Sequence, residues 1–204
     1  MANYLLEHGA NPSIASTPGN HTPLHPAAAH NDGSILQSDD GRDDSTLVEC
    51  LIQHGADVMA SADSKILQFT GWVAKTSRMN MYWTSEKDVT RSGMVYPLHC
   101  AASSGAIQRI KALLAAGADI HTRTAPGGKT ALQLAASKSH RSMVRFLIQR
   151  GLDHRLTDTE GHTMVHYLSL GGRYEPVSVK DFLVAEKLYD ASMEPELVRL
   201  RPFK

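Results

Sequence analysis

Hydrophobic and polar residues alternate along the chain in short blocks with helical spacing, and four of these blocks end in the same way. In each, a Leu-Leu or Leu-Ile pair is followed by two residues, then Gly, then Ala or Leu, then Asn or Asp; the copies occupy residues 5–11, 51–57, 113–119 and 147–153. Glycine directly after a helix suits a left-handed C-terminal cap, which a residue with a Cβ adopts only at a cost of about 1 kcal/mol. The pattern predicts four short helices that each end in a tight turn.

A second shared pattern lies at residues 22–28, 96–102, 130–136 and 163–169. In the first copy, Thr22 is placed to cap a helix and Pro23 to occupy its first position, where the missing N–H costs nothing. The paired alanines of the first three copies allow close packing, and the leucines supply buried apolar volume. Each unit is predicted to be a helix, a tight turn, a second helix and a turn that projects toward the next unit. Such repeated units bury their apolar faces on one another.

Together the two patterns resemble the ankyrin repeat, with its Thr-Pro-Leu-His-x-Ala-Ala and Leu-Leu-x-x-Gly-Ala-Asp signatures. The resemblance covers most of the chain. It implies an all-α ankyrin-repeat solenoid of stacked helix-turn-helix units with two insertions. Three features depart from the family pattern: Tyr96 replaces the threonine, Pro26 lies inside a first helix, and the fourth copy at 163–169 is degraded.

The spacing of the capping glycines shows where the array is interrupted. Gly9, Gly55, Gly117 and Gly151 lie 46, 62 and 34 residues apart, and only the last interval is close to the ankyrin period of about 33. We therefore expect a half repeat at 1–12, a repeat at 13–58 with an insertion at 32–45, a repeat at 59–120 with an insertion at 60–91, a repeat at 121–153, a capping repeat at 154–190 and a tail at 191–204. Loops tolerate such insertions because their closure entropy grows slowly with length.

The two ends of the array are predicted to differ. Residues 1–11 resemble only the second helix of a unit, which leaves an apolar face uncovered; we expect a fragment of a larger array, a shortened gene product or a face capped by a partner. The chain itself is expected to be a monomer or such a fragment. Residues 180–189 have apolar positions at helical spacing but lack the Gly-Ala-Asp ending. They are predicted to form a terminal capping helix.

Composition restricts the class of partner and the compartment. Lys and Arg together number 21, as do Asp and Glu, so the chain lacks the overall basic field of a nucleic-acid-binding domain. The sequence has no apolar run that could span a bilayer and does not open with a signal peptide. Cys50 and Cys100 are interpreted as small core residues rather than as a disulfide framework or nucleophiles. We expect a cytoplasmic or nuclear protein that binds neither nucleic acid nor membrane.

The eleven histidines invite a metal hypothesis, but the repeat offers a simpler account. His25, His99 and His166 share one slot of the motif, where the resemblance implies that the ring hydrogen-bonds between neighbouring turns. His21 and His162 precede the motif threonine, in the turn. Neither a metal-ligand set nor a nucleophile motif is recognised, and Gly128-Lys129-Thr130 fails as a phosphate loop because its first glycine would have to replace Arg123. We expect no cofactor, no metal and no enzymatic activity.

The resemblance places a concave binding surface along the projecting turns and the first helices. Mapped by their offset within each unit, the candidate contacts are His21, His30, Ser104, Lys129, Lys138, Glu160 and His162. We therefore expect a non-catalytic module that binds another protein of unspecified identity. Each single position has a competing interpretation as ordinary solvated loop.

Aromatic residues mark the second insertion as a further candidate. Trp72 and Trp83 lie there, and tryptophan is enriched at binding hot spots. These side chains could equally form a small core that orders the insertion itself. The alternative function is an enzyme, or a regulatory segment of one, with a small-molecule pocket built by residues 60–91.

Overall fold

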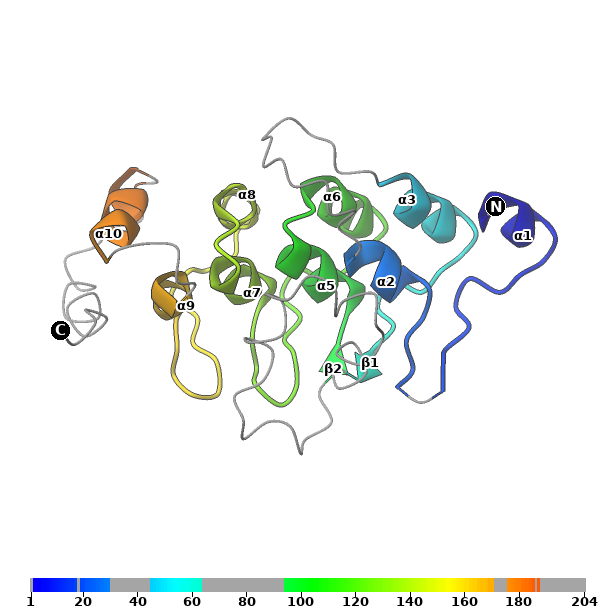
Figure 1. The fold of residues 1–204 in the computed structure, drawn as a ribbon, viewed down its shortest axis with the longest axis horizontal. Coiled ribbons are helices and arrows are strands. Elements are labelled where there is room, and N and C mark those ends of the chain that lie inside the picture. The colour runs from blue at the N-terminus through cyan, green and yellow to red at the C-terminus, as the bar shows by residue number, and fades with distance from the viewer. Residues whose placement is uncertain are drawn as a thin grey trace.

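The structure, a computed structural model, describes residues 2–17, 19–29, 45–63, 94–170, 176–185 and 187. These residues form an elongated stack of short helices in two rows, with loops that project from one side (Figure 1). The inner row contains α2 (Leu24–Ala29), α5 (Pro97–Ser104), α7 (Ala131–Ser137) and α9 (Met164–Leu170), and the outer row contains α1 (Ala2–Glu7), α3 (Thr46–Gln53), α6 (Ile107–Ala115), α8 (Arg141–Gln149) and α10 (Pro176–Ala185). None of the helices in this described part is long and apolar enough to cross a membrane.

The predicted all-α solenoid of stacked helical pairs is confirmed. Within a unit the inner helix packs on the outer one, and along the stack α2 contacts α5, α5 contacts α7, and α7 contacts α9. The core is continuous through these contacts and includes Leu98, Leu132, Ile110, Leu113 and Leu147, each no more than 1% exposed. The alanine pairs of α5 and α7 are fully buried, because only a small side chain fits where two helices approach closely.

Local sequence explains where the helices begin and end. The hydroxyl of Thr130 accepts a hydrogen bond from the backbone N–H of Gln133, and the Gln133 side chain accepts one from the N–H of Thr130, which forms a capping box at the start of α7. Outer helices end at glycines: Gly9, Gly55, Gly117 and Gly151 all have φ between +85° and +93°. The predicted left-handed caps are therefore present after four outer helices, α1, α3, α6 and α8.

His25 and His99 have the structural role that the resemblance implied for their shared slot. His25 donates from Nε2 to the carbonyl oxygen of Val95 at 3.3 Å, and His99 donates in the same way to Thr122 at 3.1 Å. In the third unit Gln133 replaces the histidine, and its amide nitrogen donates to the carbonyl oxygens of Leu156 and His162, at 3.0 and 2.8 Å. In the first three units this slot therefore ties an inner helix to the backbone of the following turn.

The structure adds one element that was not predicted and corrects two local predictions. Ala62–Asp63, assigned to the insertion 60–91, form a short strand β1 that pairs antiparallel with β2 (Met94–Val95). Val95 belongs to this ladder and is 1% exposed. Cys50, predicted to be buried, is partly exposed, since it lies at the edge of α3 near Asn3 of α1 rather than between the rows. The helix expected at 180–189 begins four residues earlier, at Pro176.

Candidate partner-binding surface

The projecting turns form one continuous row along the stack. Each neighbouring pair is joined through the backbone: Asp63 donates to Gly19 at 2.8 Å, Asp63 lies opposite Met94 in the β1–β2 ladder, Ala125 donates to Met94 at 3.1 Å, and Thr159 donates to Gly127 at 3.2 Å. The row lies on the side of the inner helices away from the outer row (Figure 1). Hydrogen bonds between turns restrict their relative motion, so the side chains at their tips are held on a defined scaffold.

Arg123 adds a side-chain link between the third and fourth turns. Its guanidinium donates to the carbonyl oxygen of Gly128 at 3.1 Å, within its own turn, and to that of Thr157 at 2.9 Å, in the next. The residue is exposed. This role was not predicted, because Arg123 lies ahead of the turn positions that the motif offset selects and the pattern of the repeat carries no signal for it.

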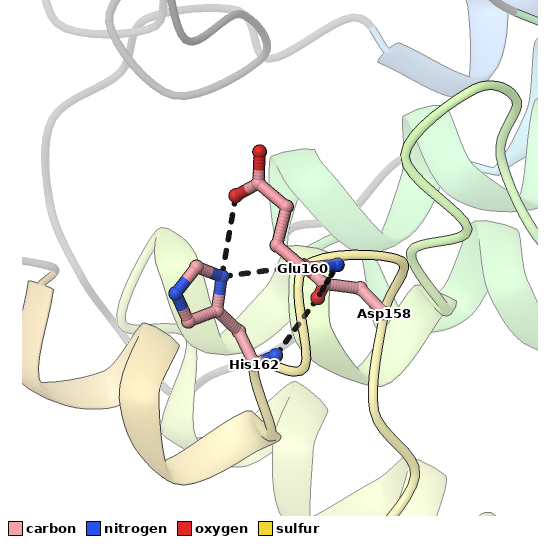
Figure 2. Close-up of side chains that lie close together, drawn as sticks. All are labelled: Asp158, Glu160 and His162. Atoms are coloured by element: carbon pink, nitrogen blue, oxygen red, sulfur yellow. Dashed lines mark hydrogen bonds and ion pairs between the residues drawn. The ribbon is translucent and has the colours of Figure 1, made fainter.

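Asp158 organises the last turn, where Glu160 and His162 also lie (Figure 2). One carboxylate oxygen of Asp158 accepts from the backbone N–H groups of Glu160 and His162, at 2.9 and 2.8 Å, and the other accepts from the hydroxyl of Tyr167 on α9. Burial alone would raise the pKa of this carboxyl. The hydrogen bonds from Tyr167 and from the two N–H groups outweigh burial and hold the pKa below its usual value.

Glu160 and His162 come together at the tip of this turn. Nδ1 of His162 lies 3.4 Å from a Glu160 carboxylate oxygen and 3.7 Å from Asp158 (Figure 2). In the part of the chain that the structure describes, these three residues are the one group with ligand atoms close enough to hold a metal ion together. This Asp-x-Glu-x-His pattern was not predicted as a metal site. Because the Asp158 carboxylate already accepts three hydrogen bonds from the protein, formation of the turn explains its position.

Lys129, on the preceding turn, approaches the same place. Its ammonium lies 5.3 Å from the centre of the Tyr167 ring, and the His162 ring is 6.0 Å from that of Tyr167. Lys129 and His162, predicted separately from repeat offsets, therefore both lie beside Tyr167, and Glu160 lies next to His162. Tyr167 was not predicted as part of this group.

The two inner-helix candidates lie at the ends of neighbouring helices. The hydroxyl of Ser104 donates toward the carbonyl oxygens of Ala28 on α2 and Ala101 on its own helix, at 3.2 and 3.0 Å. Lys138 follows α7 and is half-buried, and burial lowers the pKa of its ammonium to about 8. Ser104 thus stabilises the packing of two helices through its hydrogen bond and remains partly exposed. The ammonium of Lys138 is itself poorly solvated.

Of the remaining candidates, His21 makes a structural contact and the other three lie outside the described residues. Nε2 of His21 donates to the carbonyl oxygen of Asp63 at 2.9 Å, which joins the first turn to β1, and burial lowers the pKa of this ring. His30, Trp72 and Trp83 lie outside the described residues, as do nearly all of the two predicted insertions and the tail at 191–204.

Comparison with known proteins places the repeat in a family. Residues 92–186 match the model described as ankyrin repeats, in three copies. The chain is also similar to the phosphocholine transferase AnkX of Legionella pneumophila, with 34% identity over 68 residues, and to the human NAD-capped RNA hydrolase NUDT12, with 29% identity over 80 residues. These matches cover 33% and 39% of this chain, but only 7% and 17% of the two relatives.

Ankyrin repeats are generally protein-interaction modules, and the observed stack has the paired helices, glycine caps and projecting turns that their pattern implies. The match begins at residue 92, just ahead of β2, and extends through the three helical pairs from α5 to α10. Both the family match and the fold identify residues 92–186 as ankyrin repeats.

Proposed function

We propose that this chain is a non-catalytic interaction module that binds a partner protein through the concave surface formed by its turns and inner helices. The observation that carries the proposal is the hydrogen-bonded row of turns, from Gly19 to Thr159. A surface held in place before binding loses little conformational entropy when a partner arrives. The family, whose repeats generally act in protein interactions, supports the same function.

The contacts that we assign to the partner are polar groups on both parts of this surface. Glu160 and His162 present partly exposed side chains at a turn tip, and Lys129 adds a cation beside them. Ser104 and Lys138 extend the surface onto the ends of α5 and α7. A mixed surface of this kind favours a partner with complementary charges, because charge complementarity selects partners and accelerates association.

The names of the two relatives do not extend this function to catalysis. One is a phosphocholine transferase and the other an NAD-capped RNA hydrolase, but the matched segments are small parts of those proteins. We infer that this chain shares a binding module with them and not a reaction. A metabolite or metal that raised the melting temperature of the purified chain would contradict this, since a ligand of the folded state stabilises it.

Affinity capture from the source cell, followed by mass spectrometry, tests the binding surface. The test variant replaces Lys129, Glu160 and His162 with alanine. Alanine at 160 and 162 keeps the backbone N–H groups that bond to Asp158, so we expect the melting temperature to fall by less than about 3 °C. The captured partner should be lost.

Lys111→Ala provides a matched control. Lys111 lies on the outer helix α6, and its ammonium is 5.9 Å from the centre of the Phe146 ring, much as Lys129 approaches Tyr167. The control removes a lysine–aromatic contact from the opposite side of the stack. A protein retained by wild type and by this control, but lost from the triple variant, is a partner of the concave surface. Equal capture by all three would refute the proposal.

A further inference from the structure

Charge is distributed unevenly along the stack, although the chain as a whole is neutral. Residues 97–152, which form the two units from α5 to α8, contain eight lysines and arginines and a single acidic residue, Asp119. Their formal charge is therefore +7, and the rest of the chain carries −7. The described residues between 2 and 63 include four acidic residues and no lysine or arginine. An acidic ligand is therefore attracted to the middle of the array and not to its first units.

Arg123 and Lys129 bring two of these cations to the third projecting turn, on the concave surface. The guanidinium of Arg123 donates from Nη1 to the carbonyl oxygen of Gly128, the residue directly before Lys129, and to that of Thr157. These two bonds hold the exposed guanidinium in place. Its Nε and Nη2 groups make no hydrogen bond with the residues that the structure describes. They can donate two parallel bonds to one carboxylate, which is a strong and specific arrangement.

Neither cation is neutralised by a carboxylate of the described chain. Arg123 and Lys129 form no ion pair with the residues that the structure describes, and the Lys129 ammonium lies beside the ring of Tyr167 instead. Glu160, the exposed carboxylate of the next turn, lies next to His162. Both positive charges are therefore open to a carboxylate from outside the chain.

The basic part of the concave surface is about one repeat wide. Lys138 adds a third cation at the far end of α7, a helix about 10 Å long, and an extended peptide covers that length with about three residues. The turns on either side carry the acidic residues Asp63 and Glu160. A short acidic peptide fits between them, whereas a long uniform polyanion would meet both. The ring of Tyr167 is 6% exposed and offers no face on which a nucleobase could stack.

We propose that the partner presents a short acidic segment, rich in Asp or Glu, to the third turn, where Arg123 and Lys129 bind its carboxylates. This inference rests on the proposed function, because it gives the chemistry of the partner that the same surface binds. A second copy of the chain is a less suitable source. The acidic residues Glu7, Glu49 and Asp57 of its described first units are separated along the sequence and do not form one acidic segment.

Fluorescence anisotropy with a defined peptide tests this proposal. The probe is a fluorescein-labelled peptide of about 12 residues, in which Glu alternates with Ser, and its matched control has Gln in place of every Glu. The measurement is made in about 0.1 M salt, where charges more than about 10 Å apart are largely screened. We expect the Glu peptide to bind at least about tenfold more tightly than the Gln peptide, because hydrogen bonds between charged groups are stronger than those between neutral ones.

Two double variants with the same change in net charge locate the binding. Arg123→Gln with Lys129→Gln removes both cations of the third turn. Lys111→Gln with Arg150→Gln removes two cations that lie beside the Phe146 ring in the outer row. The turn variant should weaken binding of the Glu peptide by at least about tenfold. The outer-row variant should weaken it by less than about twofold, because screening limits the effect of distant charges.

Lys129→Gln alone keeps the test valid if Arg123→Gln lowers the melting temperature. The Lys129 side chain makes no hydrogen bond with the residues that the structure describes, so this single variant should melt with wild type. It should weaken binding of the Glu peptide by about threefold or more, because one of the two cations that hold its carboxylates is lost.

Several outcomes would overturn the proposal. Equal binding of the Glu and Gln peptides would do so, as would equal weakening by the two double variants. Tighter binding of a uridine oligonucleotide or of phosphatidylserine vesicles would assign the turn to another class of polyanion. Sedimentation that showed a dimer, dissociated by the turn variant alone, would assign it to a second copy. The proposed function is tested separately, because loss of the captured partner from the Lys129, Glu160 and His162 triple variant would support it even if the acidic peptide failed to bind.

Discussion

Replacement of His99 by glutamine should make the chain less sensitive to acid. His99 is fully buried; its Nδ1 accepts from the backbone N–H of Tyr96 at 3.3 Å while Nε2 donates to Thr122. This arrangement requires the neutral ring, because a proton on Nδ1 would face another donor. Burial lowers the pKa of His99 from 6.5 to about 4. Glutamine can make both bonds without a titrating group, as Gln133 does in the same slot.

The sign and size of the effect follow from this pKa. Below pH 6.5 the unfolded chain binds a proton at position 99, and the folded chain does not until the pH approaches 4. The contribution of His99 to the free energy of unfolding is therefore complete above pH 6.5 and decreases as the pH falls toward 4. At 1.36 kcal/mol per pH unit, the loss from His99 is about 2 kcal/mol at pH 5. His25, also fully buried with a pKa of about 4, should add a similar loss.

Urea denaturation followed by circular dichroism at pH 7.5, 6 and 5 measures this dependence. Between pH 7.5 and 5, His99→Gln should lose about 2 kcal/mol less than wild type, and the double variant with His25→Gln about 4 kcal/mol less. His121→Gln, at an exposed turn position, is the matched control and should follow wild type. If His99→Gln and wild type showed the same pH dependence, the neutral, doubly bonded ring would not be the folded-state form, and the reasoning would fail.

Two smaller predictions test packing elsewhere in the stack. Gly117→Ala, where the added Cβ meets nothing within 4 Å, should cost about 1 kcal/mol for its positive φ alone. Gly105→Ala should cost at least about 1 kcal/mol more, because its Cβ would lie 2.7 Å from the His140 ring; equal losses in urea denaturation would contradict this. In native protein, a maleimide should modify Cys50 and spare Cys100, which is buried with its pKa raised to about 12. Mass spectrometry that found Cys100 modified first would show that α5 opens.

The fold could be predicted from the sequence because its determinants are local and repeated. A glycine after an apolar pair requires a left-handed cap wherever it occurs, and four occurrences give the same φ. The error at Cys50 has a structural cause that recurs along the stack. The equivalent positions, Ala112 and Phe146, are also only partly buried, so the slot before the buried leucine faces the edge of the outer row in every unit.

The candidate surface was harder to predict, because its contacts join different units. The distance between Lys129 and Tyr167 depends on how one turn stacks on the next unit. The position of either residue within its own repeat does not determine that geometry. Arg123 reaches Thr157 for the same reason. The β1–β2 pairing joins residues on either side of a long intervening segment. A two-residue strand carries too little hydrophobic alternation to be recognised without its partner.

The β1–β2 pairing also explains how the array continues across the second insertion. Asp63 lies opposite Met94, and Asp63 and Met94 are in turn bonded to Gly19 and Ala125 of the neighbouring turns. The ends of the intervening chain are thus fixed in the row of turns, and α2 packs on α5 directly. Lengthening a loop whose ends are already held together costs little, since closure entropy grows only with the logarithm of length. A change in the number of residues between Asp63 and Met94 should therefore leave the core unchanged, and both of these residues lie in the row of turns that forms the proposed partner-binding surface.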